Sequence, residues 1–334
     1  MAGKRGKTPP DEMLMPDSSS TEAERPSQRW FTLNTFLGCI LLLLAINEAN
    51  YRLIRPTQRI ELGARAASLR FEPIRRGSLS GGWRVAGAWR VSSDDPRFGG
   101  VSALAVDGDE LVALTDFGSV IRFAKPGSGE VRARIAEVSP GPRTTWLKAN
   151  WDIEAVARDP LGRGWWASFE HPGELWLYQP GFRRALERIR LGRFARSGNR
   201  GIEGVTSDGG DLLLFAESGG TVVRIRGARA RIERIAGEPP RISDVAELGR
   251  GRWLAIERRL SWRGFRNRLV ELERAPGGFR RVGSFAIPAG PLDNFEGLAV
   301  ERSNGRVRLW LVSDDSFEKP FRTVLLALDR PAAP

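Results

Sequence analysis

The sequence predicts an all-β fold, a β-propeller, and three observations carry the prediction. Five segments repeat one pattern: a polar residue opens a short apolar strand, a Gly or Asp turn follows, a second apolar strand ends in an acid, and a third strand completes the segment. Successive repeats are 52, 49, 41 and 52 residues apart, as for four-stranded propeller blades. The apolar runs are short and bounded by Gly, Asp, Pro and Ser, and no amphipathic stretch of helical period stands out.

The number of blades follows from what precedes the first repeat. Residues 82–93 (GWRVAGAWRVSS) form another strand-like segment, and a further segment spans residues 59–74. Propellers commonly use a strand from one chain end to complete a blade begun at the other, because an unclosed ring leaves exposed sheet edges. Five repeats with these two segments predict six blades, and five blades is the alternative.

The N-terminal region divides into three parts. Residues 1–29 are rich in Pro, Ser, Thr and charge, a composition that predicts disorder. Residues 30–47 contain the uncharged run Trp30 to Ile46, which predicts a transmembrane anchor or an uncleaved signal, with a buried helix as the alternative. Residues 48–58 are then a linker, and the propeller occupies residues 59–330. Arginines flank the run on both sides, so the positive-inside rule gives no clear orientation for the propeller.

Composition narrows the possible chemistry. The single cysteine, Cys39, lies in the apolar run, so the propeller has no disulfide, no cysteine nucleophile and no thiolate metal site. With His171 as the only histidine, a Ser-His-Asp triad or a multi-histidine site is also disfavoured. The net charge of +12 is spread along the strands rather than clustered, so nucleic acid is not an expected partner.

Acidic residues recur at two positions of the repeat. Because equivalent positions of the blades surround one axis, we expect these side chains to form a double collar. The strand-opening members are Glu154, Glu203, Asp244 and Glu296, with Ser102 as the fifth, and the strand-end members are Asp116, Glu170, Glu217, Glu257 and Asp314. Clustered carboxylates must be protonated, paired with arginine or bound to a cation, and oxygen ligands suit Ca²⁺. The alternative interpretation is that these acids cap the blade strands.

Cations adjoin the predicted collar in the sequence. They are Arg143 and Lys148 before Glu154, Arg200 before Glu203, and Arg258 and Arg259 after Glu257. Guanidinium groups match the oxygens of a phosphate, so these residues are candidates for binding an anionic substrate, or else they neutralise the acids. His171 is either a general base or a loop histidine.

Two further residue types have structural interpretations. Asp94 with Asp95, and Asp314 with Asp315, are typical of turn caps. Trp165, Trp166, Trp176, Trp253 and Trp310 are expected to pack between blades.

Five phrases carry a resemblance to a known family. They are WRVAGAWRVSSDDPRFGGVSALAVDG, NRGIEGVTSDG, LAIERRLSWRG, DNFEGLAV and LVSDDSFEKPFRTVLLAL, in this order. Together they resemble the phytase-like family, also described as esterase-like activity of phytase, over residues 59–329. The resemblance implies a propeller and a hydrolase of phosphate or carboxylic esters. Together with the general habit of N-terminal anchors, it also implies that the propeller lies on the periplasmic side of a bacterial inner membrane. Ser102 stands where the other repeats have an acid, and Asp244 replaces Glu.

Two functions remain open from the sequence. The first is a membrane-tethered, metal-dependent hydrolase in which Glu203, Glu296 and Glu154 are catalytic and Ca²⁺ is held by the collar. The second is a non-catalytic propeller that binds a partner at the cell envelope, because propellers often serve as scaffolds.

Overall fold

A computed structural model describes residues 64–331, except 80, 128, 140, 142–150, 172, 193–200 and 304. The chain divides into two compact units, residues 1–49 and 50–334, and all described residues belong to the second. The predicted tail, apolar anchor and linker lie outside the described residues. Within the described part, no helix is long and apolar enough to cross a bilayer.

The described residues form twenty-one strands, which confirms the all-β prediction. Four groups of consecutive antiparallel strands, and one group closed by a strand from the N-terminal side, build the fold. The strands are β1 Arg65–Pro73, β2 Arg84–Ser93, β3 Val101–Asp107, β4 Glu110–Thr115, β5 Ser119–Ala124, β6 Gly129–Glu137, β7 Ile153–Arg158, β8 Trp165–Phe169, β9 Glu174–Tyr178, β10 Ala185–Arg190, β11 Ile202–Asp208, β12 Asp211–Ala216, β13 Thr221–Arg226, β14 Arg229–Ala236, β15 Ile242–Gly249, β16 Arg252–Ser261, β17 Gly264–Ala275, β18 Gly278–Ala286, β19 Asn294–Ser303, β20 Arg306–Asp314 and β21 Val324–Pro331.

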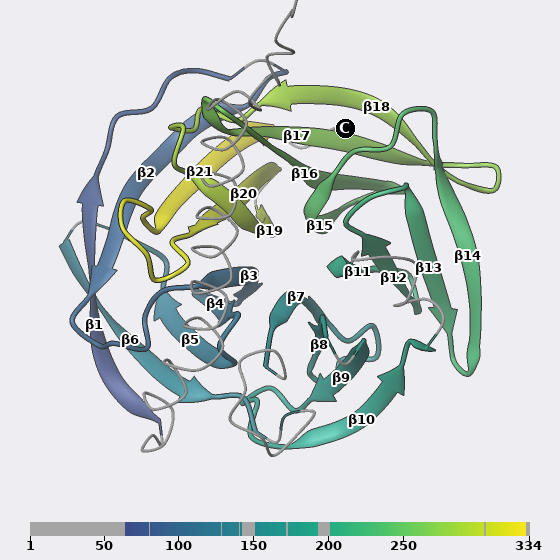
Figure 1. Cartoon of the computed structure of the whole chain (residues 1–334), viewed down its shortest axis with the longest axis horizontal. Coiled ribbons are helices and arrows are strands. Elements are labelled where there is room, and N and C mark those ends of the chain that lie inside the picture. Colours follow the sequence, from purple (N-terminus) through teal and green to yellow (C-terminus); the bar gives the residue numbers. More distant parts are fainter. Residues whose placement is uncertain are drawn as a thin grey trace, which may run out of the picture. The chain divides into compact units, whose positions relative to one another are not determined.

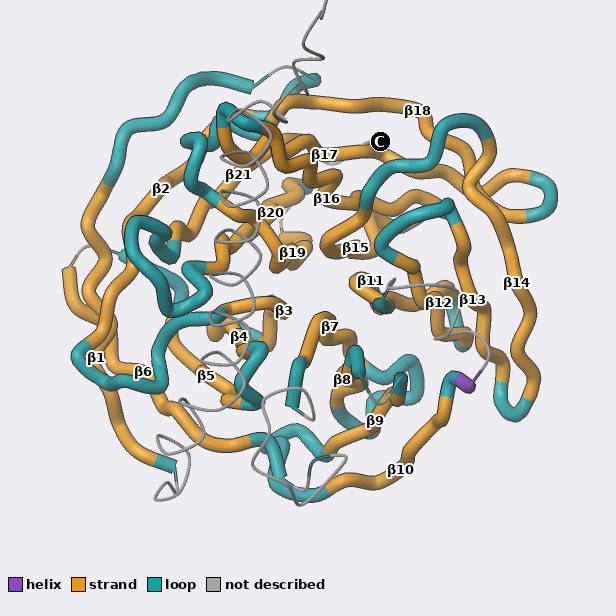
Figure 2. Tube along the Cα trace, in the orientation of Figure 1, coloured by secondary structure: helices purple, strands orange, loops and turns teal. Residues whose placement is uncertain are grey.

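Five blades surround a common centre in the described residues (Figures 1 and 2). They are β3–β6, β7–β10, β11–β14, β15–β18, and β19–β21 completed by β2. The inner strands β3, β7, β11, β15 and β19 contact one another in that order, and β19 contacts β3, so the ring is closed. Because β2 pairs with β21, the predicted closure by an N-terminal strand is confirmed.

The prediction of six blades is wrong, and its alternative of five is right. Within residues 59–74, the described part (64–74) contributes β1, which builds no blade of its own. Instead β1 pairs with β2 on one side and with β6 on the other, and so joins the outer edges of two blades. A second pair of outer edges is joined where β14 pairs in parallel with β18. These pairings cover strand edges that would otherwise be exposed.

Each of the five apolar clusters between neighbouring blades contains at least one buried tryptophan. Trp310, Trp83, Trp165, Trp166 and Trp253 each occupy a different cluster, and each is almost fully buried. Large flat side chains fill the gap between two sheets efficiently, since each buries a wide apolar area. The predicted packing role of Trp165, Trp166, Trp253 and Trp310 is therefore confirmed, and Trp176 lies in the same cluster as Trp165.

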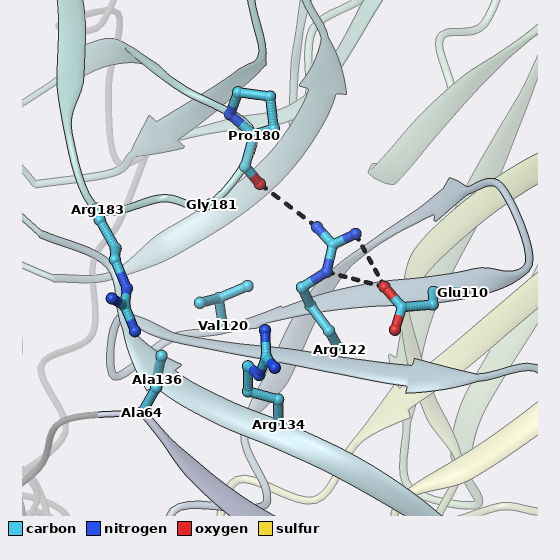
Figure 3. A pocket seen from close by; sticks show the side chains of 9 residues that line it. All are labelled: Ala64, Glu110, Val120, Arg122, Arg134, Ala136, Pro180, Gly181 and Arg183. Atoms are coloured by element: carbon cyan, nitrogen blue, oxygen red, sulfur yellow. Dashed lines mark hydrogen bonds and ion pairs between the residues drawn. The ribbon is translucent and has the colours of Figure 1, made fainter.

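Arginines on the third strand of a blade join acids of the preceding hairpin. Arg122 on β5 donates to Glu110 at 3.0 Å and to Asp107 at 2.6 Å. Figure 3 shows Arg122 also reaching the carbonyl of Pro180 in the next blade, beside a cavity of about 700 Å³ that Arg134 and Arg183 also line. This cavity lies on the outer part of the ring.

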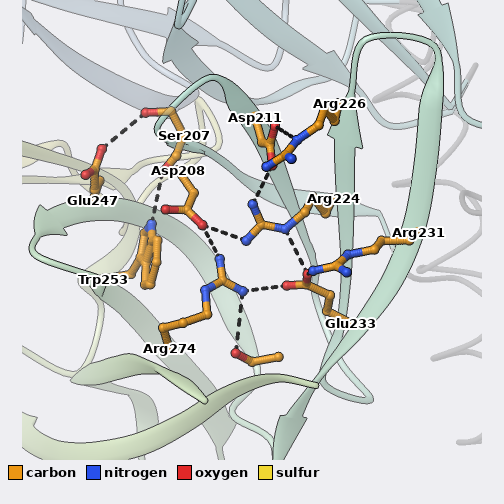
Figure 4. Close-up of polar contacts among 11 residues, drawn as sticks. Ser207, Asp208, Asp211, Arg224, Arg226, Arg231, Glu233, Glu247, Trp253 and Arg274 are labelled. Carbon is orange, nitrogen blue, oxygen red and sulfur yellow. Dashed lines mark hydrogen bonds and ion pairs between the residues drawn. The ribbon is translucent and has the colours of Figure 1, made fainter. Parts of the chain in front are cut away.

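The equivalent arginine of the third blade is the centre of a larger network. Arg224 on β13 donates to Asp208 at 2.6 Å, Asp211 at 2.7 Å and Glu233 at 2.8 Å (Figure 4). Arg274 of the next blade also binds Asp208 and Glu233, which ties the two blades together. Many of the arginines that give the chain its positive charge are thus paired with acids along the blades.

Candidate functional site

A bulge near the start of each inner strand positions the first ring of collar residues. In all five inner strands the pairing register shifts by one residue, between Val101 and Ala103, Ile153 and Ala155, Ile202 and Gly204, Ile242 and Asp244, and Phe295 and Gly297. A bulge leaves one residue out of the ladder and re-aims its side chain. The bulged residues are Ser102, Glu154, Glu203, Ser243 and Glu296.

The prediction for the fourth blade is therefore one residue out of register. Ser243, not Asp244, occupies the bulge of β15. Its hydroxyl donates to the carbonyl of Phe295 in the next blade at 3.0 Å, as the hydroxyl of Ser102 donates to Ile153 at 2.5 Å. The two serines therefore make the same hydrogen bond between neighbouring blades. The first ring of collar residues contains three acids, Glu154, Glu203 and Glu296.

Asp244 instead joins two blades at the position after the bulge. Its carboxylate accepts hydrogen bonds from the backbone N–H of Val245 at 2.7 Å and from that of Leu298, on β19, at 2.6 Å. Burial raises the pKa of Asp244 well above its usual range. These bonds give Asp244 a structural role between two blades, and its predicted role as a metal ligand stays a prediction.

The position after the bulge is crowded by the neighbouring blade, which explains the glycine of the E-G pairs. A Cβ on Gly204 would lie 2.9 Å from the Cβ of Val245 on β15, and one on Gly297 would lie 3.0 Å from the Cβ of Leu104 on β3. Ala103 and Ala155 fill this position in two other blades. The pattern therefore reflects close packing of inner strands as well as the acid that precedes it.

The second ring is defined by a shared contact at the end of the second strand. The backbone N–H groups of Asp116, Glu170, Glu217 and Arg258 each donate to the carbonyl two residues before the bulge of their own blade, at 2.9 to 3.1 Å. Asp314 lies opposite Asn294, the corresponding residue of the fifth blade. Arg258, rather than the predicted Glu257, is thus the second-ring member of the fourth blade.

Glu257 lies one residue outside this ring. It pairs with Ile242 in the ladder, is buried, and accepts hydrogen bonds from Arg259 at 2.9 Å and Arg281 at 3.4 Å. Arg259 also contacts Glu238 at 3.3 Å. Glu257 and Arg259 therefore belong to an ion-pair network, and the predictions that Glu257 holds a metal and that Arg259 binds substrate stay predictions.

Carboxylates gather around Glu203. A Cβ added to Gly201 would meet Oε1 of Glu203 at 2.6 Å and Cγ of Glu170 at 2.8 Å, so both side chains flank the same glycine. Burial raises the pKa of Glu203 to about 8, Arg258 opposes that rise, and the negative charges of Glu170, Glu217 and Asp152 add to it. Glu203 therefore holds a proton near neutral pH unless a cation takes its place.

A three-residue group beside Glu203 offers ligand atoms to a cation. One atom each from Asp152, Glu170 and His171 lies within 4.8 Å of the others. His171 Nδ1 is 3.5 Å from Asp152 Oδ2 and 3.5 Å from Glu170 Oε2. Asp152 stands two residues before the bulge of β7, a position that the sequence analysis did not consider.

Arg258 links these acids to the fifth blade. Its guanidinium donates to Glu296 and, at 2.8 Å, to the amide oxygen of Asn294. The amide nitrogen of Asn294 in turn donates to Glu296 at 2.8 Å. Glu296 is thereby a partner of Arg258, and Glu154 lies half-buried at the bulge of β7.

The remaining collar acids lie next to turns. Asp314 accepts hydrogen bonds from the N–H of Ser316 at 2.7 Å and from its hydroxyl at 2.6 Å, and Asp315 accepts one from the N–H of Gly100 at 2.8 Å. A Cβ on Gly100, whose φ is +58°, would lie 2.3 Å from Oδ1 of the buried Asp116. The predicted capping role of Asp314 and Asp315 is confirmed, as is that of Asp95, which accepts from the N–H of Arg97.

The structure thus brings together only part of the predicted site. Asp152, Glu170, His171, Glu203, Glu217, Arg258, Asn294 and Glu296 form one contiguous group, which we name the acidic group. Asp244, Glu257 and Arg259 belong to structural contacts, and Asp314 caps a turn. The predicted substrate-binding residues Arg143, Lys148 and Arg200 lie outside the described residues.

Comparison with known proteins places the chain in a family. A family model described as phytase-like, esterase-like activity of phytase, matches residues 96–317. The chain belongs to the phytase-like family. All members of the acidic group lie inside the matched range, as do the five bulges.

Other comparisons give only distant similarities. No curated protein matches the chain. Among solved structures, Myxococcus xanthus glutaminyl cyclase is 14% identical, with a TM-score of 0.48 and coverage of 78% of this chain and 100% of that one. The RRP9 WD40 repeats are 10% identical, with a TM-score of 0.41 and coverage of 77% and 100%. The β-propeller domain of Cps50 (Swd1) from Myceliophteria thermophila is 13% identical, with a TM-score of 0.37 and coverage of 65% and 66%.

Proposed function

We propose that this phytase-like protein is a divalent-cation-dependent hydrolase of phosphate or carboxylic esters and that the acidic group is its active site. The observation that carries the proposal is the meeting of Asp152, Glu170, Glu203 and Glu217 beside Arg258. Four carboxylates at one place repel one another unless a proton or cation neutralises them. Family membership supports ester hydrolysis as the reaction.

The residues of the acidic group fit a hard cation such as Ca²⁺. Asp152 and Glu170 supply carboxylate oxygens, His171 supplies a nitrogen near them, and Glu203 stands on the other side of Gly201. Ca²⁺ accepts six to eight oxygen ligands in flexible arrangements, so carboxylates from neighbouring blades suit it. When bound, such a cation polarises an ester oxygen and makes a water molecule more acidic.

Two side chains have definite tasks in this proposal. Glu203, whose pKa is raised to about 8 by burial without a cation, is ionised when a cation binds beside it, and its carboxylate can then accept a proton from water. Arg258, fixed by Glu296 and Asn294, supplies the positive charge that faces an anionic substrate. Glu296 is accordingly a positioning residue for Arg258 rather than a group that reacts.

A cation-binding assay tests the site together with the reaction. We expect Ca²⁺ to raise the melting temperature of the full chain relative to chelator, because a ligand bound only by the folded state stabilises that state. We also expect cation-dependent hydrolysis of nitrophenyl phosphate or nitrophenyl acetate. Glu170→Gln should weaken Ca²⁺ binding by at least about tenfold, since even loss of an indirect partner of a metal typically costs that much.

The matched control is Glu187→Gln in the same blade. Glu187 lies on the outer strand β10, is exposed, and pairs with Arg163. The Glu187→Gln substitution should leave both Ca²⁺ binding and ester hydrolysis unchanged. Stabilisation by Ca²⁺ without turnover of either ester would reduce the protein to a cation-binding scaffold, and absence of both effects would remove the acidic group from the function.

We further propose that the apolar run Trp30 to Ile46 tethers the protein to a membrane, with the propeller in the periplasm and Ca²⁺ supplied from there. The support is the sequence alone: the run is uncharged and long enough to span most of a hydrocarbon core. Replacing Leu42 and Leu43 by arginine should release the protein from neutral lipid vesicles in a flotation assay, since charge at the centre of a span is costly. Continued flotation of that variant would contradict the tether.

A further inference from the structure

The hairpin between β16 and β17 ends in exposed apolar side chains. Leu260 is 73% exposed and Trp262 is 88% exposed, the highest values among the large apolar residues of the described chain. Strand β16 runs from Arg252 past the second-ring residue Arg258 before it reaches this tip. The tip, residues 259–266, therefore projects at the end of the ring where the acidic group lies.

Local contacts hold the tip in place. Ser261 pairs with Gly264, and its hydroxyl donates to the carbonyl of Gly264 at 2.9 Å. A Cβ on Gly264, whose φ is +98°, would lie 2.1 Å from the carbonyl oxygen of Pro291, and Phe265 packs on Phe321 with ring centroids 6.1 Å apart. The base of the hairpin is thus packed against neighbouring loops while Leu260 and Trp262 remain exposed.

Turn chemistry does not account for the residues at the tip. Two-residue hairpin turns favour Gly, Asn and Asp. Here the turn positions are Trp262 and Arg263, with the Arg263 guanidinium 4.4 Å from the centre of the Trp262 ring. A large aromatic residue that packs on no core is expected where it contacts another molecule.

Positive charge surrounds these apolar side chains. Arg259 lies directly opposite Arg266 in the ladder, and Arg263 and Arg268 are also exposed. Like charges directly opposite each other destabilise a β-ladder. Between residues 258 and 268 the sequence contains no acid, and although Arg259 is paired with Glu257 and Glu238, the exposed Arg263 and Arg266 give the tip positive charge beside its apolar groups.

We propose that this tip inserts into the surface of an anionic lipid bilayer. Tryptophan with leucine is the apolar combination that settles at the headgroup level, and arginines pair with lipid phosphates. Nucleic acid would contact the arginines and stack on Trp262, but it would leave the exposed Leu260 without a partner. The contact turns the end of the ring that bears the acidic group toward the lipid, and it does not depend on hydrolytic activity.

The chain offers a matched pair of positions for the test. Leu161, 72% exposed, lies in the turn between β7 and β8, at the opposite end of the ring from the tip. In the full chain, Cys39→Ser removes the single natural cysteine. Leu260→Cys or Leu161→Cys is then introduced, so that each variant carries one nitrobenzoxadiazole probe at its new cysteine. The vesicles would contain phosphatidylcholine alone or with phosphatidylglycerol, with or without brominated acyl chains.

We expect a blue shift and bromine quenching of the probe at position 260 in anionic vesicles and neither change at position 161. Arg263→Gln with Arg266→Gln, and added salt, should both reduce the signal at position 260. An equal response at the two positions, no response at position 260, or a response to an oligonucleotide instead of lipid would overturn the proposal. Flotation in neutral vesicles tests the apolar run separately, and nitrophenyl ester hydrolysis tests the acidic group separately. A negative result in either assay therefore does not change the interpretation of the probe signal at position 260.

Discussion

The parent protein is expected to lose much of its stability as the pH becomes alkaline, and Glu203→Gln is expected to abolish that loss. The pKa of Glu203 rises from an ordinary value near 4.5 to about 8 in the folded protein, chiefly through burial. A carboxyl whose pKa is raised by folding stabilises the protein while it is protonated, and that stabilisation is lost as the pH rises from about 4.5 through about 8. The shift corresponds to a cost of roughly 3–5 kcal/mol when the buried group is fully ionised.

The measurement is urea unfolding of both proteins across this pH range in the presence of chelator. Glu203→Gln should match the parent near pH 5 and exceed its free energy of unfolding by a few kcal/mol near pH 9, because glutamine carries no charge to bury. Glu130→Gln, at an exposed position of β6, is the control and should follow the parent throughout. A constant difference between Glu203→Gln and the parent at all pH values would show that burial of charge is not the cause.

The same carboxyl couples protons to cations. A cation at the acidic group favours the ionised form of Glu203, so binding must release a proton below about pH 8. Ca²⁺ should therefore bind more tightly as the pH rises and should flatten the pH dependence of the parent protein. Glu203 thus connects the stability of the ring with the proposed chemistry.

The sequence predicted the architecture well because each blade is a local unit. Apolar runs, turn residues and a repeat of about 40–50 residues are visible without long-range information. The number of blades was not visible in the same way, because residues 59–74 have the composition of a blade strand. Only the pairing of β1 with both β2 and β6 distinguishes an edge strand shared by two blades from the start of a sixth.

The acidic group was predicted less completely because side-chain direction depends on the bulge. The sequence analysis chose the acid nearest to the start of each strand, which selected Asp244 in the fourth blade. Aligning the repeats on the apolar residue before the bulge instead matches Ile242 with Ile153 and therefore Ser243 with Glu154. The same one-residue offset separates Glu257 from Arg258. A bulge adds one residue locally, and in a strand of period two a single step changes the face on which a side chain lies.

Asp152 and Asn294 had a signal that the sequence analysis did not use. Both stand two residues before a bulged acid, in the strings DIE and NFE. The carbonyl of Asp152 accepts from the second-ring N–H of Glu170, and Asn294 lies opposite Asp314, so these positions adjoin the collar by backbone pairing alone. Their side chains belong to the acidic group because of this backbone pairing. The spacing of the repeats in the sequence does not reveal which residues pair.

Replacing Arg258 by methionine is expected to destabilise the ring strongly in chelator. Arg258 is the cation that binds Glu296 and Asn294 and that opposes the raised pKa of Glu203. Removing one partner of a largely buried ion pair leaves an uncompensated charge, and the expected loss is about 2–4 kcal/mol in the free energy of unfolding. Arg280→Met is the control, since Arg280 is exposed, pairs with Glu273 on the outer strands, and should change stability by less than about 0.5 kcal/mol.

Ca²⁺ separates the electrostatic role of Arg258 from simple packing. Without the guanidinium, Glu296 loses its partner and becomes a further negative charge near Asp152 and Glu170, and Glu203 loses the cation that opposes its raised pKa. A bound cation should then stabilise Arg258→Met more than it stabilises the parent, because it supplies the missing positive charge. If Ca²⁺ stabilises both proteins equally, the arginine and the cation act at separate places, and the acidic group cannot be the shared site on which the proposed function depends.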